Sequence, residues 1–253
     1  MKKFITIALS ILIILVLSFS QKKVLGYDVE LVDEHNFNYV YNDNIISNYY
    51  PYNELRNKLN NNSNLNIKGE VGNKTILITN SLDLYNWSHD LSYKNNNLSH
   101  QQKEVLASLN YALGKDIDYS ERKSNRFMPI GYSVDGITLE FTGTFDGRGF
   151  EIFELYYAVY HEYQIEDVDN VIKVPSQYFS MFNYNKGVIK NLGLINPIID
   201  LENEHPNLKA FSYLVGQNDY LVENVYIEDN RNKDGGIRAL AAKVSIDNMK
   251  TAS

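Results

Sequence analysis

The stretch FNYNKGVIKNLGLI, residues 182–195, decides the fold because it recurs 33 positions later as VGQNDYLVENVYIE, residues 215–228. Asn191 of the first copy aligns with Asn224 of the second. The apolar positions coincide as well: Ile189, Leu192 and Leu194 align with Val222, Val225 and Ile227. Gly187 and Gly216 are further repeat positions at the turns that precede these runs.

The phase of the apolar residues predicts a bend in each copy. Side chains alternate between the two faces of a strand, and Ile189 differs in parity from Leu192 and Leu194. All three can point inward only if the chain bends at Asn191. Asparagine tolerates the left-handed backbone that such a bend requires.

An earlier stretch, FTGTFDGRGFEI, residues 141–152, predicts a third copy. Its alignment matches Ile152, Leu155 and Tyr157 with the three apolar positions of the next copy, at an offset of 37. A phosphate-binding loop would be followed by a helix, whereas IFELYYAVY is typical of a strand. We therefore interpret Gly143, Gly147 and Gly149 as a structural corner, where a side chain would clash or the backbone needs positive φ.

Repeats that carry strands and no helices indicate a solenoid, in which each coil buries its apolar face on the next. The preceding region differs. Residues 27–80 predict a small α+β region, with a short helix after Pro51 and a strand at 75–79. From residue 81 to 253 we expect a helical entry segment followed by the solenoid.

Two helices are expected in the entry segment. The first has Ser81 as its N-cap, with Leu84, Trp87 and Leu91 on one face. The second has a capping box formed by Ser99 and Gln102, and apolar residues at helical spacing as far as Leu113.

The N-terminal residues 1–26 predict a signal peptide and therefore a secreted or cell-surface protein. Lys2 and Lys3 precede an apolar run from Phe4 to Leu17. Cleavage after Ser20 and cleavage after Gly26 are both open, as is an uncleaved anchor, although the apolar run hardly reaches the ~17–25 residues that a spanning helix needs. No comparable run follows, so no further membrane contact is expected.

The composition restricts the partners. The chain has no cysteine, so its stability depends on apolar burial and hydrogen bonds. Its net charge of −7 becomes −11 when the four lysines of residues 1–26 are subtracted. An acidic chain is a poor match for nucleic acid, and we expect none as a partner.

These motifs together resemble the GLUG-type repeats of bacterial surface proteins and the related segment of immunoglobulin A peptidases. That pattern has an ADIDLS-like segment, WxPIG, FxGxFDGxGHxIxNL, GLFG and GxIxNLGL. This chain shows KDIDYS at 115–120, MPIG at 128–131, FTGTFDGRGFEI, and MFNYNKGVIKNLGL at 181–194. It departs from the pattern at Glu154, where the family has Asn, and at Asn183, where GLFG ends in Gly. The resemblance covers about residues 82–227 and implies a right-handed parallel β-helix on an exported bacterial protein, in a family that includes adhesins and proteases.

Each catalytic motif that the sequence approaches is incomplete. A zinc-protease helix would need a second histidine at the place of Ile165, after His161 and Glu162. GYSVD has Asp135 where a nucleophile elbow around Ser133 needs glycine. LGKD at 113–116 lacks the first glycine and the Ser or Thr of a phosphate loop.

Acidic residues are the remaining candidates for chemistry, because hydrolases use paired carboxylates and calcium sites use several. Asp116 and Asp118 form one group, Asp146 stands alone, and Glu166, Asp167 and Asp169 form another. Neither Asp-x-Asp segment has the glycine of a calcium loop, so neither metal nor cofactor is expected. The alternative interpretation is that Asp116 and Asp118 accept backbone hydrogen bonds, that Asp146 is a turn residue, and that the last group is a solvated loop.

Tyrosines occur at 49, 50 and 52, and at 156, 157, 160 and 163. They could stack on sugars or contact a partner protein, but tyrosines more commonly just cover strands.

The sequence therefore predicts a non-catalytic binding, adhesin-like or structural β-helix module whose partner is a host or cell-envelope protein or glycan. The alternative is a carbohydrate-active enzyme, a polysaccharide lyase or hydrolase, on the same scaffold. Since an open coil end leaves strand edges unprotected, we also expect that the C-terminal segment caps the solenoid, that the chain is a piece of a longer protein, or that a partner covers the end.

Overall fold

The computed structural model describes residues 48–93, 95–122, 126–134, 136–158, 178–200, 210–229, 241–244 and 249–250. The predicted signal peptide, the motif at His161 and the acidic group Glu166, Asp167 and Asp169 lie outside the described residues. Within them the chain is mainly strands with a large parallel sheet, as the sequence predicts.

Helices and short strands alternate in the first half. The elements are β1 (Tyr49–Pro51), α3 (Tyr52–Asn61), α4 (Ile67–Val71), β2 (Thr75–Ile78), α5 (Ser81–Asp90), α6 (His100–Ala107), β3 (Asn110–Leu113), β4 (Ile117–Asp118) and the 3-10 turn η1 (Ser120–Arg122). The helix after Pro51 and the strand at 75–78 confirm two predictions.

Strands dominate the second half. They are β5 (Tyr132–Val134), β6 (Ile137–Leu139), β7 (Thr144–Asp146), β8 (Glu151–Phe153), β9 (Tyr156–Ala158), β10 (Tyr178–Phe179), β11 (Phe182–Asn185), β12 (Val188–Ile195), β13 (Ile198–Asp200), β14 (Ala210–Phe211), β15 (Val215–Asn218), β16 (Leu221–Glu228), β17 (Ala241–Val244) and β18 (Met249–Lys250).

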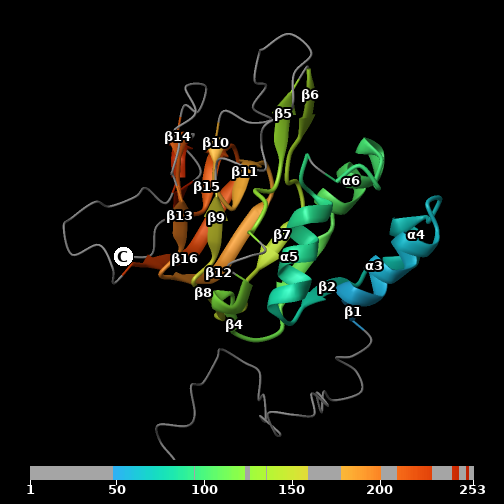
Figure 1. Ribbon diagram of the computed structural model, residues 1–253, viewed down its shortest axis with the longest axis horizontal. Coiled ribbons are helices and arrows are strands. Elements are labelled where there is room, and N and C mark those ends of the chain that lie inside the picture. The colour runs from blue at the N-terminus through green and yellow to red at the C-terminus, as the bar shows by residue number, and fades with distance from the viewer. Residues whose placement is uncertain are drawn as a thin grey trace, which may run out of the picture. The chain divides into compact units, whose positions relative to one another are not determined.

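One parallel sheet joins the two halves (Figure 1). Its strand order is β1-β2-β3-β7-β12-β16-β18, with β8 beside β12 and β4 beside β8. A single register row of buried residues crosses it: Tyr50, Ile76, Tyr111, Phe145, Ile189 and Val222. Residues 49–78 therefore share a sheet and a core with the repeats, and the boundary expected at residue 80 falls between two strands of that sheet.

The two long repeats pair in the predicted register. Ile189 of β12 lies opposite Val222 of β16, and Leu194 lies opposite Ile227. Asn191 has φ of 53° and Asn224 has φ of 51°, so both residues make the predicted left-handed bend. The bend brings residues before and after it to the same face, as the burial of Ile189, Leu192 and Leu194 shows.

The predicted register of the first copy is wrong. Ile152 of β8 lies opposite Leu194 rather than Ile189, an offset of 42 (194 − 152), and Phe145 of β7 takes the place opposite Ile189. The reason is an insertion of two residues: four residues separate Asp146 from Glu151, whereas two separate their partners in β12.

The inserted residues form a tight turn instead of a one-residue bend. Phe150 N donates to Gly147 O at 2.9 Å, and the central residues Arg148 and Gly149 have φ of 56° and 82°. Positive φ at both central positions is the type I′ pattern, for which glycine is favoured. The stretch FDGRG is thus a structural corner, as predicted. Glu154 stands where the resembled family has Asn, and it lies beside Asn196 rather than beside Asn191. Glu154 N donates to Ile195 O, and both Glu154 and Asn196 have φ of 50°.

Smaller parallel sheets accompany the large one. β11 pairs with β15, which pairs with β17, while β10 pairs with β14 and β9 with β13. The β11–β15 pair keeps the same 33-residue offset, with Phe182 opposite Val215. An antiparallel hairpin, β5–β6, extends from the rest of the fold (Figure 1).

The first entry helix begins one residue earlier than predicted. The N-cap of α5 is Asn80 rather than Ser81, because the Asn80 side chain accepts a hydrogen bond from Asp83 N at 2.9 Å. Asparagine and serine are similarly good caps, so the sequence alone could not separate neighbours. The Ser99–Gln102 capping box of α6 is confirmed.

The second entry helix is shorter than predicted. It ends at Ala107, and residues 110–113 form β3. Strand β3 lies between β2 and β7 in the large sheet, so its backbone groups bond to strands on both sides. Tertiary pairing thus overrides a helical apolar spacing that continued to Leu113.

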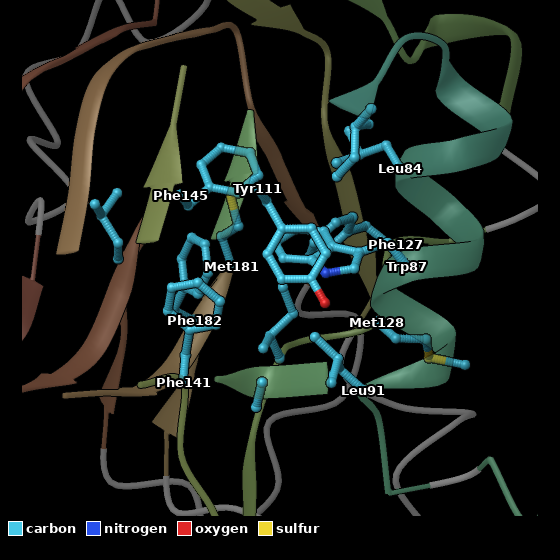
Figure 2. Packing of buried hydrophobic residues seen from close by; sticks show 14 of the residues in the cluster. Leu84, Trp87, Leu91, Tyr111, Phe127, Met128, Phe141, Phe145, Met181 and Phe182 are labelled. Carbon is cyan, nitrogen blue, oxygen red and sulfur yellow. The ribbon is translucent and has the colours of Figure 1, made fainter. Parts of the chain in front are cut away.

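The core is centred on Trp87 of α5, which is 1% exposed. Its ring stacks on Phe145 with centroids 5.1 Å apart, lies 5.0 Å from Tyr111, and meets Phe182 edge-on at 6.0 Å. Figure 2 shows α5 directing Trp87 at these rings, which come from three different strands. One helix therefore covers the inner face of the sheet, on the same side as β11.

Gly143 shows why the corner residues are glycines. A Cβ atom there would lie 1.9 Å from the Leu109 carbonyl oxygen, a backbone atom that cannot move aside. The connection between α6 and β3 passes Gly143 too closely for a side chain, which only glycine allows.

We expect Trp87→Ala to lower the free energy of unfolding by about 3–5 kcal/mol, because it leaves a cavity between the helix and two sheets. Urea denaturation followed by far-UV circular dichroism measures this. Leu82→Ala is the matched control in the same helix, since Leu82 is 45% exposed, and should change stability by less than about 0.5 kcal/mol. Similar losses for the two variants would contradict the packing.

We expect Asn191→Val to destabilise the protein by about 2 kcal/mol, because a β-branched residue is strained at positive φ. Asn191→Gly keeps the backbone conformation and loses only side-chain hydrogen bonds, so its cost should stay near ~1 kcal/mol. Thermal and urea unfolding of the two variants should therefore separate them. Equal destabilisation would show that the bend is not a constraint.

Candidate functional site

The outer face of the large sheet carries the strongest candidate surface. We define the outer face by the side chains of β7, β8, β12 and β16 that alternate away from the core. Asp146, Lys190 and Glu223 form one register row on it. Glu151, Gly193 and Tyr226 form a second row. This face is built of polar and aromatic side chains on a rigid support.

Asp146 and the bend asparagines form a hydrogen-bonded chain across three strands. Asp146 Oδ1 accepts from Arg148 N at 2.8 Å and from Asn191 Nδ2 at 3.0 Å. Asn191 Oδ1 in turn accepts from Asn224 Nδ2 at 3.2 Å, and Lys190 Nζ lies 3.5 Å from Asp146 Oδ2. Asp146 thus holds its own turn and bonds to the neighbouring strand β12, which confirms its interpretation as a turn residue.

Asp116 and Asp118 also hold backbone. Asp116 Oδ1 accepts from Glu151 N at 2.9 Å, and Asp118 Oδ1 accepts from Ser120 N at 2.8 Å at the start of η1. Asp116 lies at the outer face beside Glu151, while Asp118 belongs to the turn into η1. The structural interpretation of this pair is therefore supported by both contacts.

Tyr226 bridges two strands on the outer face. It lies opposite Gly193, which lies opposite Glu151, and the Tyr226 hydroxyl donates to Glu151 Oε1 across the glycine. A Cβ at position 193 would lie 2.6 Å from Tyr226 Cζ, so the ring occupies the space that glycine leaves open. Burial, the hydrogen bond to Glu151 and the charges of Glu151, Asp116 and Glu228 all raise the pKa of Tyr226.

The predicted tyrosine platforms divide between core and surface. Tyr50, Tyr52 and Tyr157 are buried in the core, so they stabilise the fold. Tyr49 lies under the Arg148 guanidinium at 5.5 Å, and Tyr156 under that of Arg126 at 5.9 Å. Tyr160 and Tyr163 lie outside the described residues.

Ser133 is placed in a hairpin and not on an elbow. It lies in β5, where its Oγ is 3.0 Å from Thr138 Oγ1 of the paired strand β6. The helix N-terminus that supports a nucleophile elbow is missing behind it, because β6 follows. In the described parts of the chain, no three His, Asp or Glu side chains are placed to hold a metal ion.

A second candidate is a buried polar cluster between the helices. Asp90 is 4% exposed, and both of its carboxylate oxygens accept hydrogen bonds. Its Oδ2 accepts from Tyr52 Oη at 2.5 Å and from Arg56 Nε at 3.1 Å. Its Oδ1 accepts from Asn95 Nδ2 at 2.8 Å. These bonds tie α3 and the segment after α5 to the end of α5. A carboxylate enclosed in this way is not open to a substrate, so the cluster has a structural function.

Lys103 of α6 belongs to the same buried region. It is 3% exposed, Nζ donates to Ser92 O at 2.8 Å, and the ammonium lies 5.6 Å from the Tyr132 ring centroid. Burial lowers the pKa of Lys103 to about 8, and the charge of Asp90 opposes that shift. The folded state therefore binds the lysine proton less tightly than the unfolded chain does.

Sequence reasoning missed several important residues. Asn185 and Asn218 are buried, and Asn185 Nδ2 donates to Asn218 Oδ1 at 2.6 Å, forming a second asparagine pair between the repeats. Their identity at the same 33-residue offset was the available signal. The group of Glu151, Gly193 and Tyr226 carried no such signal, because it depends on which strands are neighbours.

Comparisons of the chain with models of known protein families, with curated proteins and with solved structures found no match. Within the described ranges, none of the helices combines the length and the apolar character that crossing a bilayer requires.

We expect Lys103 to make stability rise with pH between about 8 and 9.5. Its folded pKa of about 8 lies below the ordinary value of 10.5, so the unfolded state holds more protons in this range and folding is favoured as pH rises. Above pH 10 the raised pKa values of buried Tyr52 and Tyr157 act in the opposite direction. Urea unfolding of the wild type and Lys103→Met at pH 7.0, 8.5 and 9.5 should show the increase only in the wild type; parallel curves would contradict it.

Proposed function

We propose that this chain is an exported, non-catalytic binding module built on a short right-handed parallel β-helix of GLUG-like coils. The support for the architecture is the repeated register. β11 pairs with β15 and β12 pairs with β16, both at the same offset along the chain. The strands that follow β8 and β12, which are β9 and β13, also pair with each other. Coils stacked on one another produce this recurrence, and the motif resemblance adds the handedness and the exported surface context.

The observation that carries the function is that the acidic candidates of the sequence hold backbone groups. Asp116, Asp118 and Asp146, the carboxylates that a glycan-cleaving enzyme would need, each accept a backbone N–H. Carboxylates that hold turns and strands contribute to stability, which gives each of these three acids a structural role without catalysis. What the outer face offers instead is Tyr226 and a row of amide and acidic side chains, which is the composition of a binding surface.

The chemistry of the partner follows from charge. With a net charge of −7, the chain repels polyanions, so a host or cell-envelope protein or glycan fits better than nucleic acid. A carbohydrate-active enzyme on the same scaffold is the second candidate, because Asp116 and Glu151 lie next to each other on the exposed sheet.

The purified chain should associate saturably with a cell-envelope or host-glycoprotein preparation and release no product. Surface plasmon resonance measures the association, and chromatography of the incubated material measures product. Asp118→Asn should retain binding, because asparagine can still accept the bond from Ser120 N. Release of shorter glycan or peptide fragments that stops in the Asp116→Asn variant would establish the enzyme instead.

A further inference from the structure

We infer that Tyr226 is a stacking platform for amino sugars, so that the ligand is a glycan with free amino groups. The inference rests on the proposed function and assigns its site and ligand class. It starts from the position of the Tyr226 ring on the outer face, next to Gly193 and Glu151.

The geometry of the register requires the ring to lie along the sheet. Tyr226 and Glu151 are on either side of Gly193, so two strand spacings of ~4.8 Å each separate their backbones. Their side chains meet across that span in a hydrogen bond. A tyrosine that stood upright from β16 could not reach Glu151, so the side chain extends over the glycine, with Cζ and Oη as its nearest atoms to position 193.

The Tyr226 side chain is also accessible to solvent. Tyr226 remains 46% exposed although its hydroxyl is bonded. A fixed, accessible aromatic ring binds the apolar face of a pyranose at little cost in side-chain entropy, because the hydrogen bond has already immobilised it. A freely rotating surface tyrosine lacks this advantage.

The surrounding charge selects the kind of sugar. The charged groups that act on the Tyr226 hydroxyl are the carboxyl groups of Glu151, Asp116 and Glu228. In the neighbouring row Lys190 is paired with Asp146, and Lys250 of β18 lies in register with Glu223. A sugar ammonium gains from the carboxylates and from the ring face, whereas a uronate or sialate is repelled.

The test is isothermal titration of the full chain with four probes of equal length: the hexamers of glucosamine, N-acetylglucosamine and galacturonate, and hexalysine. We expect the glucosamine hexamer to bind most tightly, and Tyr226→Ala to weaken it by about fivefold or more. Tyr220→Ala is the matched control, because Tyr220 is 52% exposed and lies outside this group; it should leave binding unchanged.

A second variant keeps the test independent of Tyr226 itself. Gly193→Ser places a side chain where the ring now lies and should weaken binding by a similar factor, while circular dichroism reports that both variants fold. Three results would overturn the inference. The first is equal binding of the glucosamine hexamer by Tyr226→Ala and wild type, and the second is equal or tighter binding of the neutral or acidic hexamer. The third is Tyr226-dependent binding of hexalysine alone. If the chain associates saturably with envelope or host material and Tyr226→Ala does not change that association, Tyr226 is not the stacking platform. The proposal that the chain is a binding module would still hold.

Discussion

The bend in the middle of each long strand is the constraint on which the rest of the structure depends. A regular strand alternates its side chains, so Ile189 and Leu192 could not both face the core. The positive φ of Asn191 and Asn224 resets the alternation, and the type I′ turn at Arg148 and Gly149 performs the same reset between β7 and β8. Because β12 and β16 bend at the same place, beside the turn between β7 and β8, the inner rows on both sides of the bend stay in register.

The bend also organises the surface. Its residues are polar and lie at the outer face, so Asp146, Asn191 and Asn224 bond to one another from strand to strand. The pair Asn185 and Asn218 repeats the arrangement inside the fold. Amide and carboxylate groups thus satisfy backbone and side-chain donors at positions where the sheet pattern is interrupted, which a stack of bends would otherwise leave unpaired. The same stacking sets Tyr226, Gly193 and Glu151 side by side.

The first half of the chain extends the large sheet and packs helices on the core. Strands β1, β2 and β3 extend the large sheet, and α5 covers its inner face with Trp87. The buried bonds of Asp90 and Lys103 hold α3, α5 and α6 together beside that face. Helices therefore cover this part of the inner face of the sheet.

The sequence by itself determined the repeat, its register between residues 182–195 and 215–228, the left-handed bends, the corner glycines and the Ser99 capping box. Each of these is local, or is visible as a fixed offset between copies. Only the tertiary structure decided that residues 110–113 form a strand, because two neighbouring strands supply the hydrogen bonds that the helix would have supplied. It also decided the register of the first copy, since β7 and β8 both pair with β12 and the two extra residues between them are accommodated in a turn. The Tyr226 group came from the structure alone: its three residues are far apart in the chain, and only strand pairing makes them neighbours.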